Sequence, residues 1–415
     1  MMQKLQDRRT FLAASAASAG AIALGAPAVQ ALGANEKLNI GLIGSGNRGR
    51  TIILECAKAG HNIVAVADIA KFRQDFICGK LDEVKQPKPA VYDDFRKLLE
   101  HKGLDAVVIA TPDHHHKDCL LAAMAAGKHA YIEKPLTHVI EDGKDMIKAV
   151  RDAKRIVQVG NQRHSGEHWK NARDVIQSPD FGDLVWVKVW DCRNWIKRDP
   201  FAPPATFNAE QIKGVNWDAF LGKAPKVKFD PVRYWSWRWF WDYAGGLMTD
   251  IGAHQLDIVQ WLGGVEAPKS VVANGGNYHF KHWETPDVIH GVWDYGKFAA
   301  TFAVEFVNGY EGVGATFFGT KMTVNADADY GGEIKVYETI DKPTPALKPK
   351  MSWKVENETP AHVRNWLDAV KANKDPSSPI ELGNRVIIAA HLANMAYRTG
   401  KKIVWDAEKQ QVVKG

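Results

Sequence analysis

The sequence predicts a two-part α/β protein, in which a mostly parallel sheet with helices on both faces is followed by a half built on an antiparallel sheet. Three observations support this prediction. Short apolar strands alternate with helical stretches between residues 38 and 162, and a glycine-rich turn follows the first strand. Short β-rich runs punctuated by Gly, Asn or Asp occur at 183–192, 269–277, 287–294, 298–306 and 312–325. Strands that alternate with helices indicate a doubly wound sheet, and closely spaced short strands indicate antiparallel pairing.

The first strand–helix unit has the features of a dinucleotide-binding site. A short apolar strand at 38–44 is followed by the pattern GxGxxG and by a helical stretch at 47–59. The first glycine permits a tight turn, the second lets a pyrophosphate approach the backbone, and the third lets helix and strand pack closely. The helix N-terminus offers unpaired N–H groups to the phosphates. The residues expected to contact the cofactor here are Gly44, Gly46, Asn47, Arg48 and Gly49. A merely structural glycine turn is the alternative.

The second strand, NIVAVAD, indicates which dinucleotide is bound. It ends in Asp68, at the distance past the glycines where such sites place an acidic residue. The carboxylate can accept hydrogen bonds from a ribose diol and would repel a 2′-phosphate, so NAD is expected rather than NADP. Lys71 and Arg73 lie just beyond and keep NADP as an alternative.

Further strand–helix units extend the sheet. Strands are predicted at 104–111, 129–135 and 155–162, and a helix at 114–126. Ligands of such sheets bind beyond the carboxyl ends of the strands. The cofactor contacts expected from these ends are Thr111, Pro112, Asp113, His116, Glu133, Lys134 and Gln162, with His116 near the nicotinamide.

Three polar stretches could carry chemistry. ATPDHHH at 110–116 and YIEKPL at 131–136 each close a predicted strand, and GGLMTDIGAHQ occupies 245–255. In the last stretch Asp250 and His254 are four residues apart, a spacing that places both on one face of a helix.

The combination of motifs resembles the Gfo/Idh/MocA family, named for glucose–fructose oxidoreductase, inositol dehydrogenase and a rhizopine-catabolism protein. The resemblance rests on GSGNRG at 44–49, TPDHHH at 111–116, EKP at 133–135 and Asp-x-x-x-His at 250–254. It implies a Rossmann domain, a second domain with a large, mostly antiparallel sheet and closing C-terminal helices at 360–373 and 383–398. It also implies a homo-oligomer, either a dimer or a tetramer.

The same resemblance implies the reaction, an NAD(P)-dependent oxidation of a CH–OH group in a sugar or polyol. By this match Lys134, Asp250 and His254 are the catalytic candidates, and the Lys134–Pro135 bond is expected to be cis. His254 suits the base that removes the hydroxyl proton, and Lys134 can stabilise the developing alkoxide. Asp250 can orient the imidazole or hold a neighbouring hydroxyl. Lys134 and His254 could exchange roles.

Aromatic residues suggest where a sugar lies. The stretch RYWSWRWFWDY at 233–243 precedes the Asp-x-x-x-His pair, and aromatic faces stack well on sugars. Trp237, Tyr243 and also Arg163 are the expected substrate contacts, with core or subunit packing as the alternative. The His114–His116 run predicts no metal site, because consecutive histidines cannot all face one ion. Residues 194–232 are expected to cross over the site or an interface.

The N-terminus has the pattern of a twin-arginine (Tat) export signal. Arg8 and Arg9 precede an Ala-rich apolar run and small-residue cleavage sites. The run is too short to span a bilayer, so we expect the Tat machinery as a partner, a periplasmic or otherwise exported location, and no membrane span after cleavage. The expected domains are 1–34 (signal), 35–157 (dinucleotide) and 158–415 (substrate and oligomerisation). A cytoplasmic dehydrogenase with a misinterpreted leader is the alternative.

Composition narrows the function classes. The chain has 45% hydrophobic and 25% charged residues and a net charge of +6. It has no basic run of the nucleic-acid-binding type, so we expect no nucleic-acid partner. Its four cysteines form no CxxC pair, so we expect no disulfide framework.

Export of a dinucleotide protein predicts a tightly bound cofactor, whose hydride must be returned within the same site. The expected function is therefore an exported oxidoreductase acting on a sugar, polyol or sugar derivative. One alternative is a redox-neutral glycosidase, lyase or epimerase that works through a transient keto-sugar. An alternative of another class is a non-catalytic binding protein that the cofactor stabilises.

Overall fold

The computed structural model describes residues 36–197, 199, 201–342 and 347–413. The export signal expected at residues 1–34 lies outside these ranges. Among the described residues, none of the helices combines the length and apolarity that a membrane crossing requires.

The N-terminal half is a Rossmann domain, as the sequence predicts. Its six strands pair in parallel in the order β3-β2-β1-β4-β5-β6. Every residue of β4 and β5 is buried, which explains why these strands are continuous apolar runs without alternation. The strands are β1 (Asn39–Ile43), β2 (Asn62–Ala67), β3 (Ala90–Tyr92), β4 (Ala106–Ile109), β5 (His129–Ile132) and β6 (Val157–Val159).

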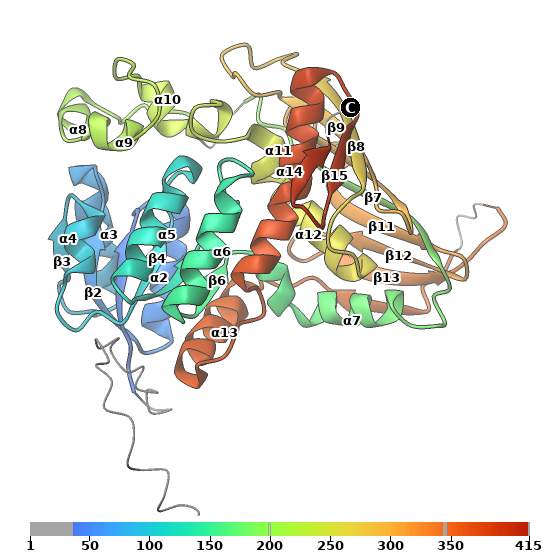
Figure 1. Cartoon of the computed structure of the whole chain (residues 1–415), viewed down its shortest axis with the longest axis horizontal. Helices are drawn as coiled ribbons and strands as arrows, with labels where there is room; N and C mark the ends of the chain where they lie inside the picture. The colour runs from blue at the N-terminus through green and yellow to red at the C-terminus, as the bar shows by residue number, and fades with distance from the viewer. Residues whose placement is uncertain (1–35, 198, 200, 343–346, 414–415) are drawn as a thin grey trace, which may run out of the picture.

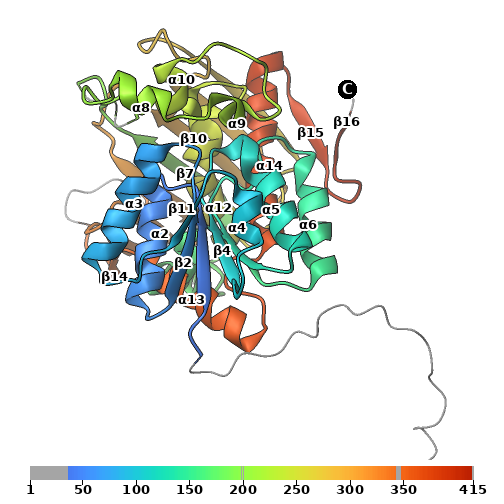
Figure 2. The same ribbon diagram turned by 90° about the vertical axis from the view of Figure 1, so that its left-hand side faces the viewer.

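Helices cover both faces of this sheet. Figure 2 shows α2 and α3 on one side and α4, α5 and α6 on the other. The strand order reverses between β1 and β4, and in doubly wound sheets such a switch point is where ligands bind. The helices are α2 (Asn47–Lys58), α3 (Lys71–Glu83), α4 (Phe95–Leu99), α5 (His116–Ala125) and α6 (Asp142–Ala153).

The second half is built on a ten-stranded sheet, ordered β14-β13-β12-β11-β7-β10-β9-β8-β15-β16. Its central pair, β7 and β10, is parallel, and the other described pairs are antiparallel. Strand β9 alternates between buried and exposed residues, as expected for a sheet covered on one face. The strands are β7 (Leu184–Cys192), β8 (Ser270–Gly276), β9 (Val288–Asp294), β10 (Ala299–Glu305), β11 (Val313–Gly319), β12 (Met322–Asp327), β13 (Glu333–Glu338), β14 (Met351–Lys354), β15 (Ile403–Asp406) and β16 (Gln411–Val413).

The last two described helices join the two halves, and α11 and α12 pack near the large sheet. Figure 1 shows α14 running between the Rossmann domain and the large sheet, and α13 contacts α2. The pair expected on one helix lies instead on two, because α11 ends at Asp250 and α12 begins at Gly252. These helices are α7 (Glu167–Ile176), α11 (Gly246–Asp250), α12 (Gly252–Gly263), α13 (Thr359–Ala372) and α14 (Ile380–Thr399).

A segment of the second half crosses above the Rossmann domain. Residues 201–240, which we call the strap, carry three short helices that lie above the blue and cyan helices in Figure 1. The backbone N–H of Asn216 donates to the carbonyl of Ile69 over 2.9 Å, and Lys71 donates to Gly214 over 3.0 Å. The strap therefore pairs with the loop that follows β2. Its helices are α8 (Ala209–Lys213), α9 (Trp217–Leu221) and α10 (Pro231–Trp235).

Candidate active site

The glycine turn leaves room for a ligand against the backbone. Gly44 has φ +90°, and a Cβ there would lie 2.7 Å from the carbonyl oxygen of Ala110. A Cβ on Gly49 would overlap the carbonyl oxygen of Gly44, so helix and strand touch at this point. Gly46 faces open space and lines a cavity. A side chain at the first or third glycine would clash with the backbone, whereas one at Gly46 would project into unfilled space beside the turn.

The groups around this turn fit a dinucleotide. Helix α2 has no side-chain cap at its N-terminus, so its first N–H groups are available to phosphate oxygens. The hydroxyls of Ser45 and Thr111 are buried without a partner among the described residues. At the end of β2, Asp68 accepts the N–H of Ser45 over 2.6 Å and that of Ala70 over 3.0 Å. These bonds fix its carboxylate at the cavity wall, where a ribose would lie.

The cavity continues from the glycine turn to helices α11 and α12 of the second half. Its volume is about 730 Å³, within the usual range of ligand sites. The strap contributes Asn216, Phe220 and Trp235 to its wall, so both halves of the chain enclose it. The cofactor contacts expected from the sequence that line it are Gly44, Gly46, Asn47, Arg48, Asp68, Thr111, Pro112, Asp113, Glu133, Lys134 and Gln162.

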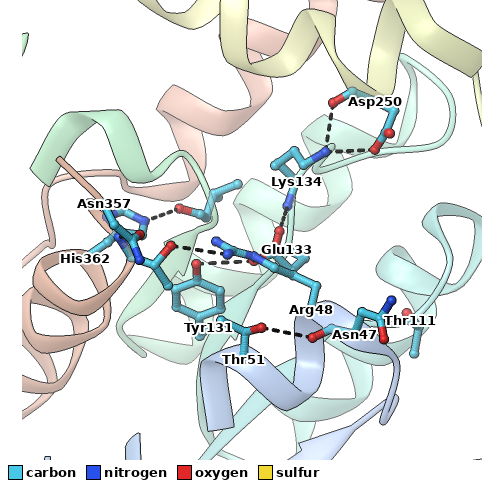
Figure 3. A network of polar contacts seen from close by, with 12 residues as sticks. Asn47, Arg48, Thr51, Thr111, Tyr131, Glu133, Lys134, Asp250, Asn357 and His362 are labelled. Atoms are coloured by element: carbon cyan, nitrogen blue, oxygen red, sulfur yellow. Dashed lines mark hydrogen bonds and ion pairs between the residues drawn. The ribbon is translucent and has the colours of Figure 1, made fainter. Parts of the chain in front are cut away.

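The three catalytic candidates meet at the far end of this cavity. Lys134 follows β5, and its bond to Pro135 is cis. Its ammonium donates to Asp250 Oδ1 and to the Asp250 carbonyl, both over 2.8 Å, as Figure 3 shows. His254 lies in the first turn of α12 and lines the same cavity. Within the described part of the chain, no hydrogen-bond partner faces its ring, so the imidazole is free to bind a ligand.

Electrostatics give these groups different protonation states. Burial would raise the pKa of Asp250, but the charges of Lys134 and Arg238 outweigh burial and lower it overall. Burial, with the charges of Lys134 and Arg163, holds the pKa of His254 well below its usual range. Near pH 7 the site therefore combines the Asp250 carboxylate with a neutral His254 imidazole, which can accept a proton.

A second ion pair fixes the strand end that carries Lys134. Arg48 Nε donates to Glu133 Oε1 over 2.7 Å, and Tyr131 donates to the same oxygen over 3.3 Å. The other oxygen of Glu133 accepts the backbone N–H of Lys134 over 3.2 Å. Figure 3 places this network between the glycine turn and α13, where Arg48 also donates to Thr359. Glu133 thus connects the glycine turn to the backbone of Lys134.

Four of the expected contacts lie outside the cavity wall. Gly49 packs against the turn, as described above. His116 is buried between the carbonyls of Pro135 and Thr111, at 2.8 and 3.0 Å, and burial lowers its pKa to about 4. A neutral ring carries one N–H and can donate to only one of these two carbonyls. The ring lies between the strand ends that follow β4 and β5 and outside the cavity wall, whereas the sequence predicted a position near the nicotinamide.

The two other residues outside the cavity wall, Arg163 and Tyr243, were predicted to contact the substrate. Arg163 donates to the carbonyl of His254 over 3.0 Å and to Gln255 over 3.1 Å, so it supports α12 from behind. Tyr243 is fully buried and its ring lies 5.1 Å from that of His114. Trp237 alone of the three substrate candidates lines the cavity.

Among the cavity residues that the sequence did not predict, Arg238 contacts the catalytic candidate Asp250. Arg238 lies between the rings of Phe201 and Trp237, 4.2 Å from each centroid, and its Nε is 3.4 Å from Asp250 Oδ2. It belongs to the aromatic stretch 233–243, in which the sequence predicts Trp237 and Tyr243 as the sugar contacts. The signal available in the sequence was an arginine flanked by aromatic residues shortly before the Asp-x-x-x-His pair, because a guanidinium packs well against aromatic rings.

The histidine run holds the strap. His114 Nε2 and His115 Nε2 each lie 2.7 Å from the carbonyl oxygen of Phe220. The three rings of the run therefore face backbone carbonyls. Among the described residues, no group of three or more His, Cys, Asp and Glu side chains is placed to hold a metal ion.

Two family models match the chain. Residues 38–161 match the model described as the oxidoreductase family, NAD-binding Rossmann fold, and residues 222–325 match the GFO/IDH/MocA C-terminal domain. Together the models cover more than half of the chain.

Two curated relatives match about a third of this chain. An inositol 2-dehydrogenase of Serratia proteamaculans is 34% identical over 153 residues, which is 36% of this chain and 44% of that protein. An α-N-acetylgalactosaminidase of Shewanella oneidensis is 30% identical over 156 residues, or 36% of this chain and 34% of that protein. The chain thus aligns with less than half the length of these relatives.

Among solved structures, levoglucosan dehydrogenase in complex with NADH and levoglucosan superposes with a TM-score of 0.69. It is 18% identical, and the match covers 89% of this chain and 99% of that one. At this identity the likeness shows the shared two-domain fold.

Proposed function

This chain belongs to the Gfo/Idh/MocA family of oxidoreductases, and from that premise we propose that it moves hydride between a nicotinamide cofactor and a secondary alcohol of a sugar, polyol or sugar derivative. The observation that carries the proposal is the position of Lys134, Asp250 and His254 on the wall of the cavity that begins at the glycine turn. A bound nicotinamide cofactor supplies the hydride chemistry. The chain supplies binding, orientation and proton transfer.

The charge of each side chain indicates its part in proton transfer. His254 is neutral near pH 7, so it accepts the hydroxyl proton during oxidation. Lys134, held by Asp250, donates a hydrogen bond to the reacting oxygen and stabilises the negative charge that develops there. Asp250 keeps the ammonium in place. This assignment makes His254 the base, a choice that the sequence left open.

The cofactor is proposed to be NAD, and to remain bound through turnover. The Asp68 carboxylate favours a free ribose diol over a 2′-phosphate, although Arg73 lines the same end of the cavity. The strap covers that end, which supports slow escape. At association rates of about 10⁵–10⁷ M⁻¹s⁻¹, retention for hours requires a Kd of roughly 10⁻⁹–10⁻¹¹ M.

A retained cofactor requires that the hydride be returned in place. One version of the proposal oxidises one sugar and reduces another. The second oxidises a ring hydroxyl, uses the acidity beside the ketone for cleavage or epimerisation, and then restores the hydroxyl. The similarity to an α-N-acetylgalactosaminidase is the observation that favours keeping this second version.

The deciding experiment uses the purified holoprotein. It is incubated with a panel of sugars, polyols and glycosides while reduced-nicotinamide absorbance and product masses are followed. We expect a rise of at most one equivalent per site with a sugar donor, reversed by a keto-sugar acceptor in the first version. In the second version, cleaved or epimerised product accumulates without net reduction. A protein that gives neither signal, even with added NAD, refutes the proposal and favours a non-catalytic binding protein.

Location and assembly are part of the same proposal. We propose export by the Tat route as the folded holoprotein, because a charged cofactor does not cross the membrane alone. Mass analysis of the N-terminus in fractionated cells tests this, and an uncleaved cytoplasmic protein contradicts it. We also propose a homo-oligomer, for which light scattering should give the mass of a dimer or tetramer. The outer face of the large sheet exposes Trp186, Val272 and Val292, which suits such a contact.

A further inference from the structure

A buried carboxyl group in the cavity has no assigned partner. Asp113 begins the short turn Asp113–His115 after β4, is 3% exposed and lines the cavity. Its Oδ1 is buried without a hydrogen-bond partner among the described residues. The backbone beside it is fixed, because the N–H of His114 donates to the carbonyl of Tyr243 over 3.2 Å. Since a buried unpaired polar group destabilises the fold, a ligand is the natural partner of this oxygen.

The surroundings of Asp113 indicate which ligand approaches it. The charged side chains that act on it most strongly are Asp250, Arg238 and Lys134. Asp250 and Lys134 are catalytic candidates, and Arg238 is in contact with Asp250. All three therefore belong to the end of the cavity where the reacting carbon would lie. The carboxyl therefore faces the substrate end, although the sequence predicted a cofactor contact.

Its protonation state suits a hydroxyl ligand. Burial and the negative charge of Asp250 raise the pKa of Asp113 well above its usual range, against the opposing charges of Arg238 and Lys134. A neutral carboxyl both donates and accepts hydrogen bonds, as a hydroxyl group does. A carboxylate would instead repel Asp250 across the site.

We propose that Asp113 hydrogen-bonds a hydroxyl of the carbohydrate other than the one oxidised, and so determines which sugars react. This inference rests on the proposed function and names a specificity-determining residue of its site. Lys134 and His254 serve the reacting oxygen, and Asp113 orients the ring through a second contact. A site built around a buried polar group rejects analogues that leave this group unpaired.

The test compares Asp113→Ala and Asp113→Asn with the wild type. The probes are D-glucose, D-galactose, methyl β-D-glucopyranoside and their monodeoxy analogues. We expect one deoxy analogue to lower the wild-type kcat/KM by at least about 100-fold. For Asp113→Ala, kcat/KM on the parent sugar should fall by the same factor, whereas kcat/KM on that deoxy analogue should agree with the wild-type value within about threefold. Asp113→Asn keeps a donor and an acceptor, and should retain the discrimination.

Three results would overturn the inference. The first is that Asp113→Ala lowers kcat/KM by the same factor on every sugar, and the second is that it lowers kcat/KM on none. The third is that Asp113→Asn no longer distinguishes the parent sugar from the deoxy analogue. A separate readout is the NAD that stays with the protein through gel filtration. It should be unchanged in Asp113→Ala; its loss would assign the carboxyl to the cofactor instead. If the wild type reduces its cofactor with no probe, the proposed function fails rather than the role of Asp113.

Discussion

At the scale of single residues, the site depends on one ion pair between the two halves of the chain. Lys134 follows a Rossmann strand and Asp250 ends α11, and their contact is 2.8 Å. The motif-based resemblance predicted both residues and His254. It could not predict that Arg163 supports α12 from behind, because a strand end defines an edge of the sheet but not the direction of a side chain. Arg238 was not predicted because the stretch that contains it was interpreted through its aromatic rings, as a surface for stacking on a sugar.

Replacing Lys134 should separate catalysis from cofactor binding. In Lys134→Ala the reacting oxygen loses its cationic donor, so we expect sugar-dependent cofactor reduction to fall by about 10²–10³-fold. Bound NAD should remain, because the glycine turn and Asp68 are untouched. Single-turnover absorbance and the nucleotide content of the purified variant are the two measurements. Unchanged turnover would remove Lys134 from the mechanism.

Asp68 should control the choice between NAD and NADP. Asp68→Ser removes the negative charge beside the ribose while a hydroxyl remains to accept the N–H of Ser45. We expect the preference for NAD over NADP, measured as a ratio of Kd values on protein stripped of nucleotide, to fall by roughly tenfold or more. Asp75→Ser, on the exposed side of α3, is the matched control and should leave the ratio unchanged. A constant ratio in Asp68→Ser would mean that another residue selects the cofactor.

At the scale of elements, segments with a regular apolar pattern could be predicted from the sequence, whereas short helices that depend on side-chain caps could not. Five of the six Rossmann strands and the long helices α13 and α14 follow their sequence patterns closely, because apolar periodicity and burial agree there. The short strand β3 was not predicted. The predicted run 312–325 is two strands, β11 and β12, which turn back at Gly319. The strap helices are each five residues long and depend on side-chain caps. For α10, Asp230 followed by Pro231 was a start signal available in the sequence.

The strap should control how long the cofactor stays. Gly222 has φ +54°, and a Cβ there would lie 2.7 Å from Cε1 of His115, whose ring holds the strap at Phe220. Gly222→Ala should therefore displace the strap and speed the loss of bound NAD by about tenfold or more, a factor that corresponds to about 1.4 kcal/mol. The loss is followed by dialysis against a nucleotide scavenger.

A matched glycine provides the control for this experiment. Gly79 lies within α3, and a Cβ there meets nothing within 4 Å, so Gly79→Ala should leave NAD release unchanged and stabilise the helix slightly. Equal release rates for Gly222→Ala and the wild type would show that the strap does not limit escape. A wild type that already loses NAD within minutes would instead contradict the retention proposed for the whole protein.

At the scale of the whole molecule, the two halves are held together by contacts that no local pattern reveals. Helix α13 comes from the far end of the chain yet packs on α2, and Arg48 reaches Thr359 across that contact. The sequence predicted two domains in order along the chain. It could not predict that the last helices return to the first domain, because such long-range packing depends on side chains separated by some hundreds of residues.

Buried histidines should make the folded protein sensitive to mild acid. Burial lowers the pKa of His362 to about 3, and lowers that of His116 and His391 to about 4. In the unfolded chain each ring takes up a proton below about pH 6.5, whereas in the folded protein it stays neutral down to about pH 4. The unfolded state therefore binds more protons in this window. The free energy of unfolding should fall as pH falls, by about 1.4 kcal/mol per pH unit for each such ring.

Urea unfolding at pH 7.5, 6.5, 5.5 and 5.0 measures this slope for the whole protein. His391 is a suitable single probe, since it lies on α14 against Thr137 of the Rossmann domain, with Nε2 3.1 Å from the threonine Oγ1. His391→Gln retains a side-chain donor but does not titrate, so the slope below pH 6.5 should shrink by about one proton while stability above pH 7 changes little. If the variant and the wild type lose stability in parallel, the proton taken up on unfolding does not go to His391. The contact between α14 and the Rossmann domain would then have to accommodate a charged imidazole.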